Sequence, residues 1–220
     1  MHLRNRPQWG SVVRPDARFD RLGHSDRVTT SRAAAHEPIA GDAANDAPVA
    51  VPAAAVAVVR EGVGGPEVLL VRRRRGTTFG GAWAFPGGAL EPADGAGDAR
   101  QGVAAARAAT RELAEETGVF AAPDDVVALL GPIITADLER RFTVWFFTLR
   151  AERAIEIRLN KAELTSYQWL APADALHRSA AGSLRLPPAT RAALEALSSR
   201  VDASPACASR RAGEGGVRLG

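Results

Sequence analysis

The nine residues from Arg111 to Val119 read RELAEETGV, and they constrain the chain more than any other segment. Their three glutamates, Glu112, Glu115 and Glu116, are spaced i, i+3 and i+4. On a helix with 3.6 residues per turn, these side chains fall within an arc of about 100°. Like charges at this spacing repel each other, and hard divalent cations prefer carboxylate oxygens. The cluster therefore predicts a cation-binding helix face, with an ordinary solvated face as the alternative.

The residues before this cluster predict a helix from about Ala99 to Thr117. Asp98 can act as its N-cap, and Gln101 three residues later completes a capping-box pattern. Gly118 is typical of the residue that ends a helix. Apolar residues at helical spacing form a stripe beside the glutamates, at Val103, Ala106, Ala109 and Leu113.

A glycine-rich turn precedes the helix in the segment AWAFPGGAL, residues 82–90. Pro86 has a restricted φ, whereas Gly87 and Gly88 allow backbone shapes that other residues avoid. A turn of this kind lets the backbone approach a phosphate group closely. Taken alone, it could equally be an ordinary turn.

Together the two segments resemble the Nudix hydrolase family, whose box reads G-x5-E-x7-R-E-U-x-E-E-x-G-U, with U a bulky aliphatic residue. Residues 111–119 match every specified position of its second half, and a looser resemblance runs from Ala53 to Leu197. The resemblance implies an α/β fold, a Nudix-type α/β/α sandwich with a mixed β-sheet. It also implies an enzyme that hydrolyses a diphosphate bond in a nucleoside diphosphate linked to another group. The alternative is a catalytically silent Nudix-fold module that binds a nucleotide or regulates.

The first half of the box departs from the family pattern. Asp94 stands where the family has its first glutamate, and sixteen residues, not seven, separate it from Arg111. A longer loop is therefore expected, and the role of Asp94 stays open. The insertion is loosely similar to the coenzyme A diphosphatase and peroxisomal-type branch, although the segment RRRRGTTFGGAW does not reproduce the coenzyme A signature well.

The resemblance also assigns roles within the box. It implies that Glu112, Glu115 and Glu116 bind Mg²⁺ or Mn²⁺, and that Glu115 and Glu116 belong to the catalytic set. Arg111 joins that set by orienting a glutamate through a charge-assisted hydrogen bond. The substrate implied is a small nucleotide diphosphate, such as a nucleotide sugar, ADP-ribose, a dinucleotide or a coenzyme A compound.

The resemblance implies that the general base is a glutamate, either outside the box on a variable loop or within the box. Glu163 is the first candidate, because it lies in a region where relatives often carry a glutamate. Glu156 is the second, and Asp137 and Glu139 are more remote possibilities near a strand end. Each could instead be an exposed loop carboxylate.

Substrate contacts are expected from the Gly87–Gly88 turn and from Arg73. Arg73 belongs to the run Arg72–Arg75, which follows the apolar segment EVLLV, so alternation would turn two arginines to each face. A guanidinium at the site could bind phosphate oxygens bidentately, and a solvated strand end is the alternative. Three aromatic residues could stack on a base or belong to the core: Trp83, Trp145 and Phe146.

Charge and composition define the expected domains. Residues 1–48 read as a disordered extension, 49–200 as the Nudix hydrolase domain and 201–220 as a flexible C-terminal tail. Residues 51–199 carry seventeen charges of each sign, so no basic nucleic-acid surface is expected. No signal peptide or membrane span is expected, and one cysteine, Cys207, excludes an intrachain disulfide, which favours a cytoplasmic protein. A homodimer is left open.

The hydrophobic pattern predicts a mixed succession of strands and helices. Strands are expected at Ala53–Arg60, Glu67–Arg73, Val126–Thr135, Arg141–Arg150 and Leu164–Leu170. Two further helices are expected at Pro172–Arg178 and Pro188–Ser198, each with proline near its start.

Overall fold

The structure is a computed structural model that describes residues 50–95, 101–136 and 140–202. The expected extension at 1–48 lies outside the described residues. So does the expected tail, except that residues 201–202 end a helix. The N-cap expected at Asp98 also falls outside them.

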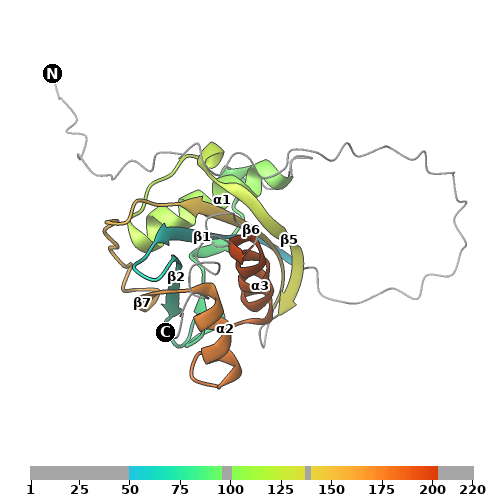
Figure 1. Cartoon of the computed structure of the whole chain (residues 1–220). Helices are drawn as coiled ribbons and strands as arrows, with labels where there is room; N and C mark the ends of the chain where they lie inside the picture. The colour runs from blue at the N-terminus through green and yellow to red at the C-terminus, as the bar shows by residue number, and fades with distance from the viewer. Residues whose placement is uncertain (1–49, 96–100, 137–139, 203–220) are drawn as a thin grey trace, which may run out of the picture.

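The element order is that of an α/β protein (Figure 1). The strands are β1 (Val51–Glu61), β2 (Pro66–Arg73), β3 (Trp83–Ala84), β4 (Gly87–Ala89), β5 (Val127–Ala136), β6 (Arg141–Arg150) and β7 (Leu164–Leu170). The helices are α1 (Gln101–Thr117), α2 (Pro172–Ala180) and α3 (Pro188–Asp202). Two short 3-10 turns are η1 (Pro92–Asp94) and η2 (Pro123–Asp125). The predicted strands β6 and β7 have the expected bounds, and the other predicted elements shift by a few residues.

The strands form one mixed sheet in the order β3-β2-β1-β6-β5. β1 and β6 pair in parallel, whereas the other pairs are antiparallel. β7 pairs with β2, and β4 pairs with the first half of β1. Strand β1 is therefore central, and the glycine turn of β4 lies directly against it.

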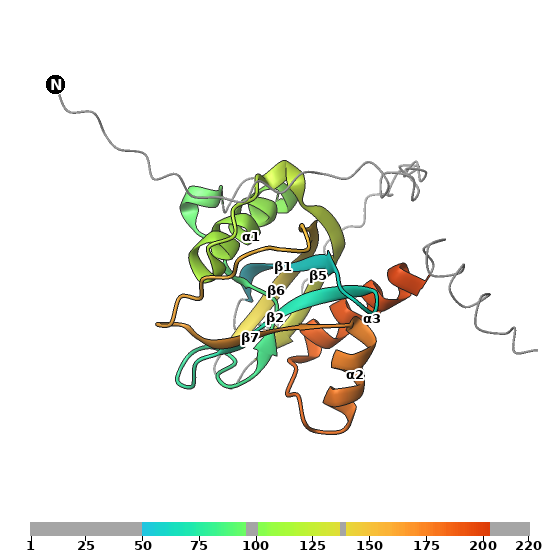
Figure 2. The ribbon, with the colours of Figure 1, turned by 60° about the vertical axis from the view of Figure 1, so that its left-hand side comes forward.

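Helices cover both faces of this sheet, with α1 on one face and α2 and α3 on the other (Figure 2). Alternate residues of β1 serve the two cores: Val56 and Val58 pack with α1, whereas Ala55 and Ala57 pack in the core that includes α3. The predicted α/β/α sandwich is confirmed. None of the described helices is both long and apolar enough to cross a membrane.

Helix α1 ends as the sequence indicates. Ala106, Ala109 and Leu113 of its apolar stripe are buried on the sheet, where small alanines let the helix approach closely. Val103, the fourth residue expected in the stripe, is instead 46% exposed. Gly118 has φ 70°, a left-handed conformation that glycine adopts easily, and its N–H donates to the Ala114 carbonyl. This packing leaves the glutamate side of the helix turned toward β4.

Candidate active site

The two glycines of β4 lie where side chains would not fit. A Cβ on Gly87 would stand 2.3 Å from the Ala54 carbonyl oxygen and 2.6 Å from the Ala55 Cα. A Cβ on Gly88 would stand 2.3 Å from Oε1 of Glu112. A side chain at Gly87 would therefore collide with the β1 backbone, whereas one at Gly88 would displace the end of the Glu112 side chain.

Glu116 is the most buried carboxylate of the site, with 1% of the residue exposed. The Gly87 N–H donates to its Oε2 at 3.0 Å, and the Arg73 guanidinium bonds to its Oε1. Burial raises its pKa to about 7, although Arg73 and the Gly87 N–H act in the opposite direction. The charges of Glu112 and Glu163 raise this pKa further. Two hydrogen bonds thus hold the Glu116 carboxylate in place, and its raised pKa means that it titrates near neutral pH.

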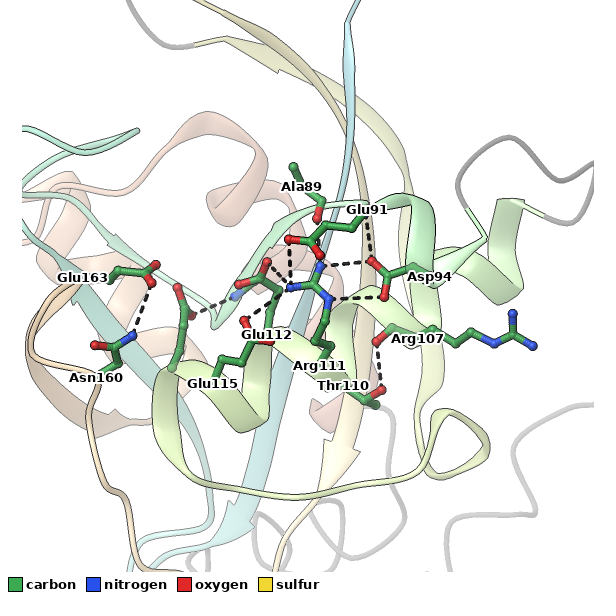
Figure 3. A network of polar contacts seen from close by, with 12 residues as sticks. Ala89, Glu91, Asp94, Arg107, Thr110, Arg111, Glu112, Glu115, Asn160 and Glu163 are labelled. Carbon is green, nitrogen blue, oxygen red and sulfur yellow. Dashed lines mark hydrogen bonds and ion pairs between the residues drawn. The ribbon is translucent and has the colours of Figure 1, made fainter.

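Arg111 is the hub of a polar network on the outer side of α1 (Figure 3). It donates to Oε1 of Glu112 at 2.9 Å, to Oε2 of Glu115 at 3.4 Å and to the Ala89 carbonyl at 3.0 Å. These contacts tie α1 to β4 and fix the Glu112 carboxylate over the glycine turn. The expected role of Arg111, orienting a glutamate, agrees with this geometry.

Asp94 completes the network from the opposite side of Arg111 (Figure 3). Arg111 donates to both carboxylate oxygens of Asp94, at 3.2 Å through Nε and 3.0 Å through Nη2. Burial alone would raise the pKa of Asp94, but the hydrogen bonds from Arg111 and from the Glu91 N–H lower it. The η1 turn places Asp94 there, so the longer spacing to Arg111 does not separate the pair.

The three glutamates of the box differ in exposure. The Glu116 side chain is 1% exposed, that of Glu112 14% and that of Glu115 57%. Burial raises the pKa of Glu112, and hydrogen bonds from Arg111 oppose that rise. Glu112 and Glu116 are therefore the inner pair, and Glu115 lies at the rim beside Arg111.

Glu163 approaches this inner pair from the loop before β7. Its negative charge raises the pKa of both Glu112 and Glu116, and Asn160 Nδ2 donates to its Oε1 at 3.2 Å. The loop is tied to the end of α1, where the Asn160 N–H donates to the Glu116 carbonyl at 2.9 Å. Of the base candidates, the structure brings Glu163 to the site.

The other base candidates are not brought together with the box. Glu156 is exposed, and its carboxylate accepts two hydrogen bonds from Arg158, each 3.0 Å long. Asp137 and Glu139 lie outside the described residues. The geometry therefore favours Glu163 over Glu156.

The arginine run divides at the end of β2. Arg73 reaches inward, bonding Glu116 and donating to the Gly87 carbonyl at 3.3 Å. Arg74 instead turns to the Lys161 carbonyl, to which its Nε donates at 3.1 Å. Arg73 is the arginine of this run that borders the site, but here its partner is a carboxylate.

The donor chemistry of the site fits a hard divalent cation. Glu112, Glu116 and Glu163 present carboxylate oxygens whose charges disfavour one another, and a cation would relieve that repulsion. The missing Cβ of Gly88 leaves room for the Glu112 carboxylate. Within the described ranges, no three such side chains are arranged to hold a metal ion together, and Glu112 and Glu116 are each paired with an arginine.

A cavity of about 200 Å³ lies next to the glycine turn. Arg73, Gly87 and Gly88 form its edge toward the glutamates. Its other walls are mainly apolar and include Phe79, Phe85, Phe142, Phe146, Ala55 and Ala189. The arrangement joins a charged centre to a pocket for an apolar or aromatic group.

The aromatic residues proposed for stacking fall in different places. Phe146 lines the cavity, but its neighbour Trp145 packs on the opposite, α1 side of the sheet. Trp83 is buried in the core. The sequence pattern does not indicate Phe79 and Phe142 as lining residues, because they come from segments distant in sequence. In the fold their ring centroids lie 5.7 Å apart.

Comparison with known proteins identifies the fold and the family. The model of the NUDIX domain matches residues 50–189. A NUDIX hydrolase from Alicyclobacillus acidocaldarius is 27% identical, with a TM-score of 0.60 over 73% of this chain and 96% of that chain. Comparison with curated proteins finds no match.

Two further solved structures share the fold. The NUDIX domain of Shewanella oneidensis NrtR, complexed with ADP ribose, is 19% identical, with a TM-score of 0.53 over 71% of this chain and 94% of that one. A C. elegans Ap4A hydrolase is 17% identical, with a TM-score of 0.53 over 70% and 99%. The prediction of a Nudix hydrolase is confirmed, and the chain belongs to the Nudix family.

Proposed function

We propose that this Nudix hydrolase uses Mg²⁺ or Mn²⁺ to hydrolyse a diphosphate bond in a nucleoside diphosphate linked to another group. The observation that carries the proposal is that buried Glu116 and half-buried Glu112 both contact the glycine turn, which borders the apolar cavity. ADP ribose bound to the NrtR domain, and the Ap4A hydrolase, support a substrate of this class.

The cation would be held by Glu112 and Glu116, with Glu115 at the rim. When bound, a divalent cation neutralises phosphate charge and lowers the pKa of water. Arg111 and Asp94 act as positioning residues, because their hydrogen bonds fix the Glu112 carboxylate. Without these contacts, Glu112 would have to become ordered each time substrate binds.

The remaining residues serve the substrate and the proton. Glu163 would accept a proton as a water oxygen attacks phosphorus, while the phosphorus–oxygen anhydride bond breaks and the second phosphate leaves. Arg73 would pair with phosphate oxygens, since it borders both Glu116 and the cavity. Gly87 and Gly88 let the phosphate chain pass close to the backbone.

The test is a substrate panel with the full chain. ADP-ribose, a dinucleoside polyphosphate, a nucleotide sugar and coenzyme A are assayed with Mg²⁺ and with Mn²⁺. We expect metal-dependent turnover of at least one, and a loss of about 100-fold or more in Glu116→Gln, because loss of even an outer-shell partner costs 10–100-fold.

Glu195→Gln, an exposed change on α3, is the matched control and should keep full turnover. Tight binding of a panel member without product over hours would instead support a silent binding module. Undiminished turnover in Glu116→Gln would overturn the proposal. Activity on coenzyme A stays a prediction, which the substrate panel tests. A homodimer also stays a prediction, which a mass measurement by light scattering tests.

A further inference from the structure

We infer that Asn160 is a positioning residue, which holds the Glu163 carboxylate toward the inner pair of glutamates and so places the general base for proton transfer. The inference deepens the proposed function and rests on it for the role of Glu163. It assigns a task to a side chain that lies outside the box and outside every motif of the sequence.

The loop that carries Asn160 and Glu163 is fastened to the end of helix α1. The Arg158 N–H donates to the Thr117 carbonyl at 2.8 Å, and the Asn160 N–H donates to the Glu116 carbonyl at 2.9 Å. These carbonyls belong to the last turn of α1, where the helix itself supplies no further donors. The loop therefore takes its position from the helical residue that carries the more buried carboxylate of the inner pair.

The same loop is also fastened to the end of strand β2. The Arg74 N–H donates to the Glu163 carbonyl at 2.7 Å, and the Arg74 Nε donates to the Lys161 carbonyl at 3.1 Å. The Asn160 carbonyl accepts from the N–H of Glu163 at 3.1 Å and of Leu164 at 2.9 Å, which closes a turn. These bonds place the Glu163 backbone, but the torsions of its side chain need a further contact to fix them.

The side-chain amide of Asn160 supplies that contact (Figure 3). Its Nδ2 donates to Oε1 of Glu163 at 3.2 Å, and its Oδ1 accepts from the Ala162 N–H at 3.1 Å. The two partners permit one orientation of the amide, because an N–H needs an acceptor and an ionised carboxylate needs a donor. The turn thus aims a donor at the Glu163 carboxylate.

This hydrogen bond opposes the repulsion that Glu163 meets at the site. Its charge disfavours the charges of Glu112 and Glu116, so the three carboxylates repel one another. A half-buried glutamate without a hydrogen bond would lower its energy by rotating toward solvent. The Asn160 donor opposes that rotation, so Glu163 faces the site before substrate binds.

A neutral donor suits a general base better than a cationic donor does. Arg158 donates twice to the exposed Glu156 and lowers its pKa. A guanidinium stabilises the ionised carboxylate in this way and makes it a weaker proton acceptor. The amide of Asn160 instead orients Glu163 without adding a positive charge.

The test replaces the donor and keeps the turn. Asn160→Asp retains an oxygen for the Ala162 N–H, as aspartate forms this turn equally well, but it loses the donor to Glu163. Tm should therefore stay within about 2 °C of wild type. With Mg²⁺ and the best diphosphate of the panel, kcat should fall about 10–100-fold and KM should change less than about twofold, because a catalytic group is misplaced and binding contacts are intact.

A double-mutant cycle identifies the residue through which Asn160 acts. In a Glu163→Gln background, Asn160→Asp should lower kcat by less than about twofold, because the base is already absent. A general loss of structure would instead multiply the two effects. Gln168→Glu is the matched control, since it makes the same amide-to-acid change on the α3 side of the sheet, opposite Leu70, and should keep wild-type kcat.

NMR of the metal-free full chain tests the hydrogen bond without any turnover. The Asn160 side-chain amide signals should shift in Glu163→Ala and stay in place in Glu156→Ala. Unshifted signals in Glu163→Ala, wild-type kcat in Asn160→Asp, or losses that multiply in the cycle would each overturn the inference. A wild-type chain that shows the amide response but turns over no panel member would contradict the proposed function alone, so the two failures are distinguishable.

Discussion

Alanine at either glycine of the β4 turn should damage the protein, but in two different ways. A Cβ on Gly88 meets the carboxylate end of Glu112, with Oε1 at 2.3 Å and Cδ at 2.5 Å. That end is flexible, so it can rotate away. A Cβ on Gly87 meets backbone, the Ala54 oxygen at 2.3 Å and the Ala55 Cα at 2.6 Å, so strand β1 itself must shift.

The two costs can be estimated separately. Moving Glu112 breaks its 2.9 Å hydrogen bond from Arg111 and costs about 1–2 kcal/mol of unfolding free energy. For a domain of this size, 1 kcal/mol lowers Tm by about 2–4 °C, so Gly88→Ala should lower it by about 2–8 °C. Overpacking against backbone costs about 3 kcal/mol or more, so Gly87→Ala should lose about 6–12 °C.

Thermal melting and Mn²⁺ titration of the same samples separate the effects. Gly88→Ala should stay folded at 25 °C yet bind Mn²⁺ about 10–100-fold more weakly, because Glu112 is displaced. Gly64→Ala is the control, since a Cβ there meets no atom within 4 Å. Two results would refute this expectation. One is wild-type Mn²⁺ affinity in Gly88→Ala, and the other is the same Tm for Gly87→Ala and Gly64→Ala.

Three other perturbations test the network around this turn. Asp94→Asn should lose about 1.5–3 kcal/mol of unfolding free energy in a urea titration, because Arg111 loses its charge-assisted hydrogen bonds to Asp94 and keeps those to Glu112 and Ala89. It should also lower kcat, and equal urea midpoints would contradict this. Glu163→Gln should lower kcat by about 10²–10⁴-fold, whereas Glu156→Gln should stay within about twofold of wild type, and the reverse order in steady-state assays would exchange their roles. Because the pKa of Glu116 is about 7 and a cation needs the carboxylate, Mn²⁺ affinity measured by calorimetry should rise about tenfold from pH 6 to 8. Between the ordinary value of 4.5 and about 7, folded Glu116 binds more protons than unfolded Glu116, so metal-free stability should fall by about 3 kcal/mol as pH rises through that window; a flat profile would count against the assigned burial.

Features of the fold that depend on neighbouring residues could be predicted from the sequence. Helix α1, its buried alanine side and its glutamate row follow from spacing within one helix. The end of this helix at Gly118 follows from glycine's access to positive φ. Strands β6 and β7 have the expected bounds because both segments are rich in apolar, aromatic and β-branched residues. Each of these features depends on neighbours close in sequence.

Contacts between distant segments were less predictable. The pairing of Asp94 with Arg111 depends on how η1 turns, which the altered box spacing conceals. Trp145 and Phe146 were both proposed for stacking, yet adjacent strand residues face opposite sides of a sheet, so they could not share one pocket. The cavity itself joins Phe79, Phe142 and Thr135, which only the folded sheet brings together.

Arg73 shows the limit of assigning a role by residue type. A guanidinium after an apolar strand was expected to bind phosphate, but the structure pairs it with Glu116. Burial of Glu116 explains why Arg73 pairs with it, because a carboxylate with 1% exposure needs a nearby positive charge or hydrogen-bond donors. Phosphate contact by Arg73 stays a prediction.

The central claim is that Glu112 and Glu116 together hold a divalent cation. Its most direct test is equilibrium binding of Mn²⁺, followed by the EPR signal of the free ion, in the full chain at pH 8. We predict that Glu112→Gln and Glu116→Gln each weaken binding about 100-fold or more, while Glu195→Gln binds as the wild type does. Equal Mn²⁺ affinity in all four proteins would contradict the claim.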